Sequence, residues 1–580
     1  MPDELDPIET FLTAIYGSEK GKQTFKKIST RLTAFQASHS PSTPPPLSQK
    51  DAVLITYGDQ FQQPGQAHLK SLTQFCHKHL KDIVSSVHIL PFFPYSSDDG
   101  FSVIDYFQVD PSLGKWEDIQ TLARSFRLMM DVVINHISSQ SAWFQEFIKG
   151  NPKYQDYFIT ADPETDLSTV VRPRALPLLT PYDTAQGQKY LWTTFSADQI
   201  DLNFANPDVL LEMIDILLKY IAHGAQMIRL DAIAYLWKQP GTTCIHLPQT
   251  HWIIQILRSI LDRVAPYALL ITETNVPHRE NVSYFGNGYN EAQMVYNFTL
   301  PPLVLHSFHT GSARQLSTWA AGLTLPSQKV TFFNFLASHD GIGINPVRGI
   351  LSETEINNLV ERTLEHGGLV SYKSNADGSQ SPYELNINYF DALSNPNAPE
   401  PLSTQIDRFI CAQAILLSMV GVPGIYVHSL LGSRSWLEGV HLTGRNRTIN
   451  REKFDLQVIE SQLADCKSQR AQVFQRYAAL LRARAGQRAF HPHGAQIFLD
   501  TGDEAIFTVL RIPPEMTPPV ICLHNVSDAN RTAVIDFKNL ELSANTWFDL
   551  VASKAYSCNK IAKIPLSPYQ VVWLTPEKEP

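Results

Sequence analysis

Short stretches of consecutive apolar residues alternate with segments of helical periodicity over most of the chain. An uninterrupted apolar stretch is typical of a strand buried on both faces of a parallel sheet. Strands that alternate with amphipathic helices predict an α/β fold, and eight of them predict a (β/α)8 TIM barrel. The predicted barrel strands are Val53–Tyr57, Val87–Phe92, Leu128–Asn135, Met227–Ile233, Leu269–Thr274, Met294–Phe298, Val330–Ala337 and Val422–Val427.

The spacing of these strands is uneven and predicts two insertions. About ninety residues separate the third strand from the fourth, and a similar number separate the seventh from the eighth. Loops of that length inside a compact domain are usually functional. We therefore expect an inserted domain after strand 3, at about residues 137–205, and a second insertion after strand 7, at about residues 341–410.

The pattern changes on both sides of the barrel, which we place at residues 51–487. Residues 1–50 have helical periodicity and end in the proline-rich turn Pro41–Pro46, so we expect an N-terminal helical extension. Residues 488–580 hold short strands separated by turns, which predicts a C-terminal antiparallel β domain. Its predicted strands are Ala495–Leu499, Ile506–Ile512, Val520–Asn525, Ala533–Phe537, Trp547–Val551 and Val571–Leu574.

Acidic residues stand at the C-terminal ends of three predicted barrel strands. Arg229 and Asp231 lie two residues apart in the fourth strand, so both side chains point to the same face. Glu273 ends the fifth apolar stretch, and Asp340 follows the seventh. A structural ion pair would explain an isolated arginine and aspartate equally well. Three acids at three strand ends instead indicate the catalytic site of a parallel barrel.

Converging carboxyl groups cannot all ionise at low cost, so their pKa values must separate. Glycoside chemistry needs this arrangement, because one carboxylate attacks the anomeric carbon while another acid protonates the leaving oxygen. A third carboxylate can stabilise the positive charge of the transition state. Arg229 would keep Asp231 ionised and oriented. His136, at the end of the third strand, and His339, beside Asp340, are candidates for hydrogen bonds to sugar hydroxyls, although a single histidine is more often structural.

Composition excludes several partners. The net charge of −9 argues against nucleic acid, since phosphate backbones need a basic face. We find no basic, apolar leader and no apolar stretch of membrane-spanning length. The six cysteines have no zinc-like spacing and are expected to be reduced thiols. We therefore expect a cytoplasmic protein that acts on small molecules.

The strand-end residues resemble, in order, the four motif regions of the α-amylase superfamily of retaining glycoside hydrolases. The regions are Asp131–His136, Arg229–Asp231, Glu273 and His339-Asp340, and Gln199–Asn203 resembles a fifth region. The resemblance implies that Asp231 is the nucleophile, Glu273 the general acid/base and Asp340 the transition-state stabiliser. It also implies a (β/α)8 barrel with an insert after the third strand and a C-terminal β domain.

A narrower resemblance is to the sucrose-phosphorylase group of that superfamily. In this group the residues matching Asp59 and Arg447 clamp the outer hydroxyls of one glucosyl unit. The residue matching Phe101 stacks on the sugar ring, and the one matching Arg174 helps to hold phosphate. Asp105 belongs to the same candidate substrate-binding set. The motifs that carry the resemblance are Leu54–Asp59, Asp98–Asp105, Arg172–Arg174, Asp340–Gly343 and Arg447–Arg451.

The chain departs from sucrose phosphorylases at two candidate binding positions. Tyr106 stands where they carry histidine, and Glu384 stands beside Tyr383 where they carry glutamine near the acceptor. Over nearly its whole length the chain looks most like the bacterial glucosylglycerate phosphorylases. This similarity includes the N-terminal helices and the segments Trp192–Gln199, Pro240–His246, Thr272–His278 and Gly432–Arg434.

The resemblance implies a retaining phosphorylase that converts 2-O-α-D-glucosylglycerate and phosphate to α-D-glucose 1-phosphate and D-glycerate by double displacement. Candidates for the partner of the glycerate carboxylate are Arg434, Arg172 and, more weakly, His246. Sucrose, sucrose 6-phosphate or glucosylglycerol phosphorolysis is the alternative, as is hydrolysis or transglucosylation at the same site. A catalytically inactive binding module is disfavoured because every acid is present.

Metal binding is not expected. Superfamily members often bind calcium near the residue matching Asn135, but the phosphorylase group generally does not. We therefore predict neither a metal nor a cofactor, with inorganic phosphate entering only as a substrate.

Overall fold

The computed structural model describes residues 6–39, 44–375, 378–540, 542, 544, 546–558 and 560–577. Eight parallel strands close into a barrel in the order β1-β16-β12-β11-β10-β9-β4-β3. Each lies within or overlaps one of the eight predicted stretches, so the predicted fold is confirmed. The strands are β1 (Val53–Thr56), β3 (Ser86–Ile89), β4 (Arg127–Val133), β9 (Ala225–Asp231), β10 (Leu269–Thr272), β11 (Met294–Tyr296), β12 (Thr331–Asn334) and β16 (Val422–Tyr426).

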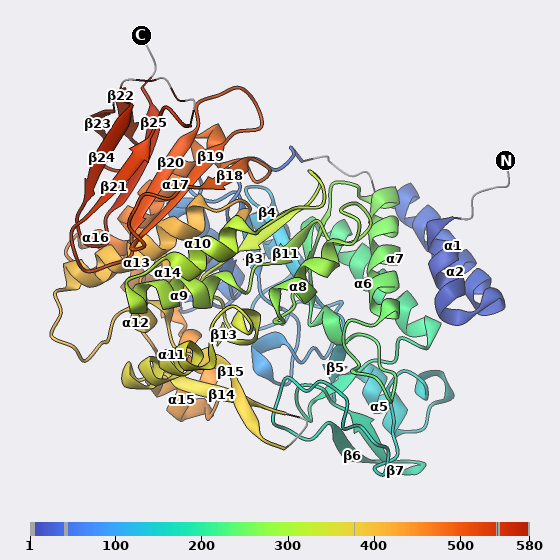
Figure 1. Ribbon diagram of the computed structural model, residues 1–580. Coiled ribbons are helices and arrows are strands. Elements are labelled where there is room, and N and C mark those ends of the chain that lie inside the picture. The colour runs from blue at the N-terminus through green and yellow to red at the C-terminus, as the bar shows by residue number, and fades with distance from the viewer. Residues whose placement is uncertain are drawn as a thin grey trace, which may run out of the picture.

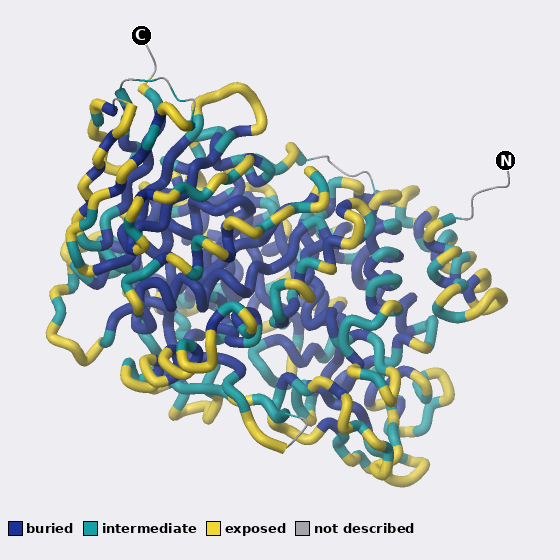
Figure 2. Tube along the Cα trace, in the orientation of Figure 1, coloured by how far each residue is buried: buried dark blue, intermediate teal, exposed yellow. Residues whose placement is uncertain are grey.

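The barrel strands are buried along almost their whole length, because helices cover their outer face and side chains fill the interior. Figure 2 shows this as a continuous buried region through the centre of the molecule. The helices between successive barrel strands are α3 (His68–His79), α4 (Trp116–Ala123), α6 (Pro207–Ala222), α7 (Pro248–Val264), α8 (His278–Asn281), α9 (Leu300–Thr310), α10 (Arg314–Ala321) and α13 (Leu402–Ser418). After β16 come α14 (Val427–Leu430), α15 (Leu437–Thr443), α16 (Leu456–Ala464) and α17 (Gln469–Ala485).

Small sheets occupy both expected insertions. The first insertion contains α5 (Ala142–Ile148) and the strand pairs β5-β8 and β6-β7, and the second contains the sheet β13-β15-β14. Figure 1 shows α5, β6 and β7 together at one end of the barrel, with the β14–β15 hairpin nearby. The inserted elements are β5 (His136–Ser138), β6 (Leu179–Thr184), β7 (Gly187–Trp192), β8 (Gln199–Asp201), β13 (Ile342–Gly343), α11 (Glu353–Glu365), β14 (Leu369–Ser374), β15 (Gln380–Asn386) and α12 (Tyr389–Leu393).

The C-terminal region is antiparallel, as predicted, but it has two strands that the sequence pattern did not reveal. They are β23 (Lys554–Ser557), a largely exposed edge strand, and β24 (Ile561–Leu566), which contains Pro565. A six-stranded sheet and the pair β21-β24 enclose a separate apolar core. The remaining strands are β18 (Ala495–Phe498), β19 (Ile506–Ile512), β20 (Val520–Asn525), β21 (Arg531–Asp536), β22 (Thr546–Asp549) and β25 (Val571–Pro576).

Two helices precede the barrel, α1 (Pro7–Tyr16) and α2 (Ser18–Ser38), and they lie beside α6 and α7 (Figure 1). The Tyr16 hydroxyl donates to the Phe204 carbonyl at 2.9 Å, and Arg31 pairs with Asp215 at 2.9 Å. Part of the proline-rich turn, residues 41–43, lies outside the described residues. Within the described part of the chain, no helix is both long and apolar enough to cross a membrane.

Candidate active site

The three predicted acids line one cavity at the C-terminal ends of the barrel strands. Asp231 is the last residue of β9, Glu273 directly follows β10, and Asp340 follows β12. Parallel strands all end at the same side of the barrel, so acids far apart in the sequence are brought together there. Strand pairing also aligns Arg229 with Asp131 on the neighbouring β4, which prepares a charge network below the cavity.

Arg229 is the centre of this buried network. Its Nη1 donates to Asp231 Oδ1 at 2.9 Å and also contacts Asp131, while its Nη2 lies 3.9 Å from Glu273 Oε2. Asp131 in turn pairs with His88 Nε2 at 2.6 Å. Burial alone would raise the pKa of Asp131, but Arg229 and His88 lower it to about 2. One guanidinium is therefore compensated by two buried carboxylates before any substrate binds.

Asp231 and Glu273 both have raised pKa values, and Arg229 opposes both shifts. Burial and the nearby Glu273 carboxyl raise the pKa of Asp231, while Arg229 opposes the shift. Burial also raises the pKa of Glu273, and the charge of Asp340 adds to that rise. Arg229 donates to Asp231 at 2.9 Å but lies 3.9 Å from Glu273, so the guanidinium favours the ionised form of Asp231 more strongly than that of Glu273. An ionised nucleophile beside a protonated acid is the arrangement that glycoside chemistry needs.

The backbone directly after Asp231 is strained. Ala232 has φ 53° and ψ 27°, a left-handed conformation that is unusual for a residue with a side chain. In this conformation its N–H donates to Glu273 Oε2 at 3.1 Å. The bond ties the end of β9 to the acid that follows β10. Strain of this kind persists where the surrounding structure holds it, as it does in many active sites.

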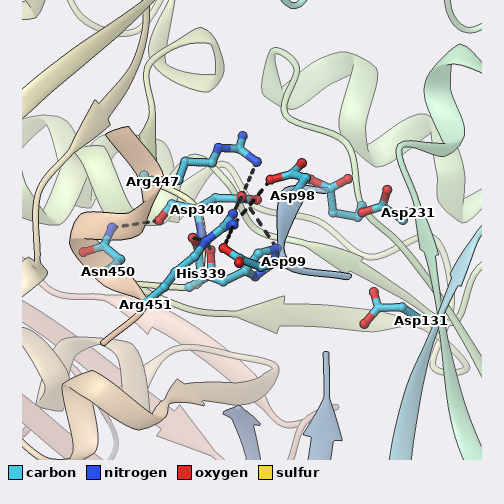
Figure 3. Close-up of polar contacts among 12 residues, drawn as sticks. Asp98, Asp99, Asp131, Asp231, His339, Asp340, Arg447, Asn450 and Arg451 are labelled. Atoms are coloured by element: carbon cyan, nitrogen blue, oxygen red, sulfur yellow. Dashed lines mark hydrogen bonds and ion pairs between the residues drawn. The ribbon is translucent and has the colours of Figure 1, made fainter. Parts of the chain in front are cut away.

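Asp340 is surrounded by two arginines from the segment that follows α15 (Figure 3). Arg447 Nη1 makes an ion pair with its carboxylate, and Arg451 Nη2 lies 3.6 Å away. Arg451 also pairs with Asp99 at 2.6 Å and Asp98 at 3.3 Å. Burial would lower the pKa of Arg447, but Asp340 and Glu384 raise it well above its usual value. Arg447 is therefore a charged group that two carboxylates of the cavity compensate.

Two aromatic rings form an apolar surface beside the acids. Phe101 stacks on His339 with ring centroids 4.7 Å apart and an interplanar angle of 3°. Burial lowers the pKa of His339 well below its usual value, and the neighbouring arginines lower it further. His136 contacts the Phe101 carbonyl through Nε2 at 2.9 Å. Both histidines are thus neutral, and both line the cavity as expected.

Comparison with known proteins agrees with this architecture. Residues 73–341 match the family described as alpha amylase, catalytic domain. The chain is 48% identical to a glucosylglycerate phosphorylase of Spirochaeta thermophila over 100% of both chains. It is 52% identical to a glucosylglycerate phosphorylase of Allomeiothermus silvanus over 91% of each chain. The chain belongs to the glucosylglycerate phosphorylase family.

A solved structure of a related enzyme has the same fold. It is a sucrose 6F-phosphate phosphorylase from Thermoanaerobacter thermosaccharolyticum, with a TM-score of 0.71 and 26% sequence identity. The similarity covers 84% of this chain and 95% of that one. The relationship to the sucrose-phosphorylase group, inferred above from motifs, therefore extends to the three-dimensional structure.

Many residues predicted from the sequence do reach the cavity. Arg174, from the first insertion, lies with its guanidinium carbon 5.7 Å from the centre of the Tyr383 ring. Arg447 and Glu384 form a bidentate ion pair in the same part of the wall, with Nη2 at 2.7 Å and Nε at 3.0 Å from the carboxylate. The predicted residues that line the cavity are Phe101, His136, Arg174, Asp231, Glu273, His339, Asp340, Tyr383, Glu384 and Arg447.

Arg229 lies below the cavity, in the network with Asp131 and Asp231, and four other predicted residues do not line the cavity either. Asp59 pairs with Lys453 Nζ at 2.6 Å, and Asp105 accepts the Phe107 N–H at 2.8 Å in a turn. The Tyr106 hydroxyl donates to the Val133 carbonyl at 2.7 Å and supports the backbone below the site. Arg434 pairs with Asp391 at 2.8 Å. Each side chain is engaged by a neighbour that the sequence pattern does not reveal.

The other two candidates for the glycerate carboxylate are also elsewhere. Arg172 donates to the Leu176 carbonyl within its own loop, and His246 contacts Tyr284 at 2.7 Å and Glu280 at 3.2 Å. Neither residue lines the cavity. Arg174 belongs to the same insertion and does line the cavity, although it was predicted only to bind phosphate.

Several lining residues were not proposed individually from the sequence. Asp98 and Asn275 stand inside the motifs Asp98–Asp105 and Thr272–His278, and Tyr235 closely follows the fourth predicted strand, but their side-chain directions depend on strained loops and tertiary packing. Asp98 and Asp99 have φ of 53° and 49°, and Gly100 permits a sharp turn in which a Cβ would meet the Pro91 carbonyl oxygen at 2.5 Å. The additional lining residues are Asp98, Phe195, Gln199, Ala232, Tyr235, Thr274, Asn275, Phe298 and Gly341.

A buried lysine contacts Asn135, the residue near which the family resemblance suggested a calcium site in other members. Lys238 Nζ lies 2.6 Å from Asn135 Oδ1 and 2.5 Å from Asp201 Oδ2, and its side chain is almost completely buried. The ammonium group compensates the buried Asp201 carboxylate and donates to the amide oxygen of Asn135. Among the described residues, no group of three or more histidine, cysteine or acidic side chains is arranged to hold a metal ion.

Proposed function

We propose that the chain catalyses the reversible phosphorolysis of 2-O-α-D-glucosylglycerate to α-D-glucose 1-phosphate and D-glycerate, with retention of configuration. The observation that carries the proposal is the cavity itself, which is lined by Asp231, Glu273 and Asp340 together with Arg174. The acids are the groups that glucosyl transfer needs, and the arginine is suited to an oxyanion. The near-full-length identity with glucosylglycerate phosphorylases supports glycerate as the acceptor.

In the first step Asp231 attacks the anomeric carbon. The bond from that carbon to the glycerate oxygen breaks, and Glu273 transfers its proton to the departing oxygen. Asp340 stabilises the oxocarbenium-like charge that develops on the sugar. In the second step a phosphate oxygen attacks the same carbon from the side that glycerate left, the bond to Asp231 breaks, and the phosphate proton returns to Glu273. Two displacements retain the configuration.

Acceptor identity is tested in the synthetic direction with α-D-glucose 1-phosphate as donor. D-glycerate is expected to be glucosylated about ten- to hundredfold more efficiently than glycerol, because one ionic hydrogen bond is worth roughly 1.5–3 kcal/mol. Phosphate release measures the rate for glycerate, glycerol, fructose and fructose 6-phosphate. A better rate with glycerol or fructose 6-phosphate would contradict the acceptor. Free glucose in place of glucose 1-phosphate during breakdown of the glucoside would indicate a hydrolase.

Arg174→Ala should raise the KM for phosphate about ten- to hundredfold and divert the intermediate towards hydrolysis. Loss of a charge-assisted hydrogen bond costs roughly 1.5–3 kcal/mol, and water then competes better with phosphate. The ratio of glucose to glucose 1-phosphate reports this change. Arg172→Ala is the matched control, since Arg172 stands two residues away and does not line the cavity. Equal phosphate dependence in both variants would place the anion site elsewhere.

We further infer a cytoplasmic location. All six cysteines are unpaired, and five of them are buried, which supports a reducing compartment.

A further inference from the structure

Glu384 occupies an unusual position, because it is a fully buried acid in the wall of a cavity that must accept anions. Its side chain is only 1% exposed. Oε1 accepts the Gly341 N–H at 2.9 Å and Arg447 Nε at 3.0 Å, while Oε2 accepts Arg447 Nη2 at 2.7 Å. Both oxygens are therefore satisfied by the protein, and Glu384 is not arranged to bind a substrate hydroxyl.

The backbone is built to allow this close approach. Strands β13 and β15 pair so that Gly343 is opposite Glu384, which brings the turn after Asp340 against the acid. A Cβ at Gly341 would lie 2.6 Å from Glu384 Cγ and 2.4 Å from the Leu385 carbonyl oxygen. Only glycine fits there without displacing the strand. The position of Glu384 is thus coupled to the segment that carries Asp340.

Glu384 stands between two arginines that serve different parts of the cavity. Arg447 donates to Glu384 through Nη2 and contacts Asp340 through Nη1. Arg174 Nη1 lies 3.9 Å from Oε2 and packs over Tyr383. Among the described lining residues, these are the two arginines, and the lining contains no lysine. The charge of Glu384 therefore weakens the attraction of both for any anion that enters.

We propose that Glu384 is a positioning residue that holds Arg447 against Asp340 and lowers the affinity of the cavity for anions. The inference rests on the proposed function, in which phosphate and glycerate each bind in one direction and leave in the other. Without Glu384 the two arginines would retain these anions more tightly, and Arg447 would lose the two hydrogen bonds that hold it against Asp340. The carboxylate of Glu384, between the two arginines, limits this retention of anions and keeps Arg447 in place.

Glu384→Gln tests the proposal through changes of opposite sign. Titration calorimetry with inorganic phosphate should show binding about tenfold tighter, equivalent to about 1.4 kcal/mol, because a negative charge next to the anion is removed. The KM for phosphate and for D-glycerate should fall, while the KM for glycerol stays unchanged. At the same time kcat should fall several-fold, because glutamine cannot accept both hydrogen bonds that hold Arg447 against Asp340. A purely structural defect would instead weaken binding and lower turnover together.

Glu400→Gln is the matched control. Glu400 makes a bidentate pair with Arg408, at 2.8 Å for one contact, and Arg408 packs over Tyr569 away from the cavity. This variant should bind phosphate as the wild type does. If Glu384→Gln does not fold, Glu384→Ala, in which water can replace the carboxylate, is measured in the same way.

Unchanged or weaker phosphate binding in a folded Glu384 variant would overturn the inference while leaving the proposed function intact. Absence of phosphorolysis in the wild type would instead overturn the proposed function and this inference with it.

Discussion

Asp231→Asn should reduce kcat by a factor on the order of 10⁴ or more while leaving the fold intact. The neutral amide is a poor nucleophile and cannot form the glucosyl ester through which both half-reactions pass. The substitution also removes one of the negative charges that compensate Arg229, which donates to Asp231 at 2.9 Å. That arginine remains paired with Asp131, so the network below the site is retained.

The measurement is steady-state phosphorolysis together with mass spectrometry of the protein after exposure to a slow 2-fluoro glucosyl donor. The wild type should gain one glucosyl unit on Asp231, and the variant should gain none. Asp215→Asn is a suitable control, because Asp215 is also paired with an arginine, Arg31, but lies outside the cavity. Substantial turnover by folded Asp231→Asn protein would exclude Asp231 as the nucleophile.

The second large effect is expected from Glu273→Gln, and its size should depend on the leaving group. Removing a general acid typically costs a factor of about 10² to 10⁴ when the departing oxygen needs a proton. The departing oxygen of glycerate needs such a proton, whereas fluoride leaves with little protonation. The variant should therefore lose far more activity on glucosylglycerate than on α-glucosyl fluoride. Equal losses on both substrates would refute the acid role, and Glu280→Gln, outside the cavity, should lose little on either.

The same variant has a predicted pH signature. Burial raises the pKa of Glu273, so the wild type keeps this group protonated to a higher pH than an ordinary glutamate. Since the protonated form is the active one, phosphorolysis should decline as the pH rises through that pKa. Asp231 must be ionised, so activity should also decline at low pH. Glu273→Gln should remove the decline at high pH and retain the one at low pH.

The barrel and its three acids could be predicted from the sequence because both depend on local patterns. A strand buried on two faces must be almost continuously apolar, so eight such stretches are visible without any tertiary information. A charge in such a stretch is costly unless it is paired, which makes Arg229, Asp231, Glu273 and Asp340 conspicuous. Parallel strands then bring all of them to one end of the barrel. The edge strands β23 and β24 escaped detection because partly exposed strands lack this signal.

Which of the polar candidates face the cavity was decided only by tertiary contacts. Glu384 and Arg447 are 63 residues apart, and their bidentate pair converts an apparent substrate ligand into a support for the site. Asp59 and Arg434 were plausible ligands by residue type, yet Lys453 and Asp391 engage them. The chemical type of each side chain is known from the sequence alone. Its partner is set by rotamers and by packing between distant segments, so only the folded structure distinguishes a charge that faces the substrate from one the protein has already neutralised.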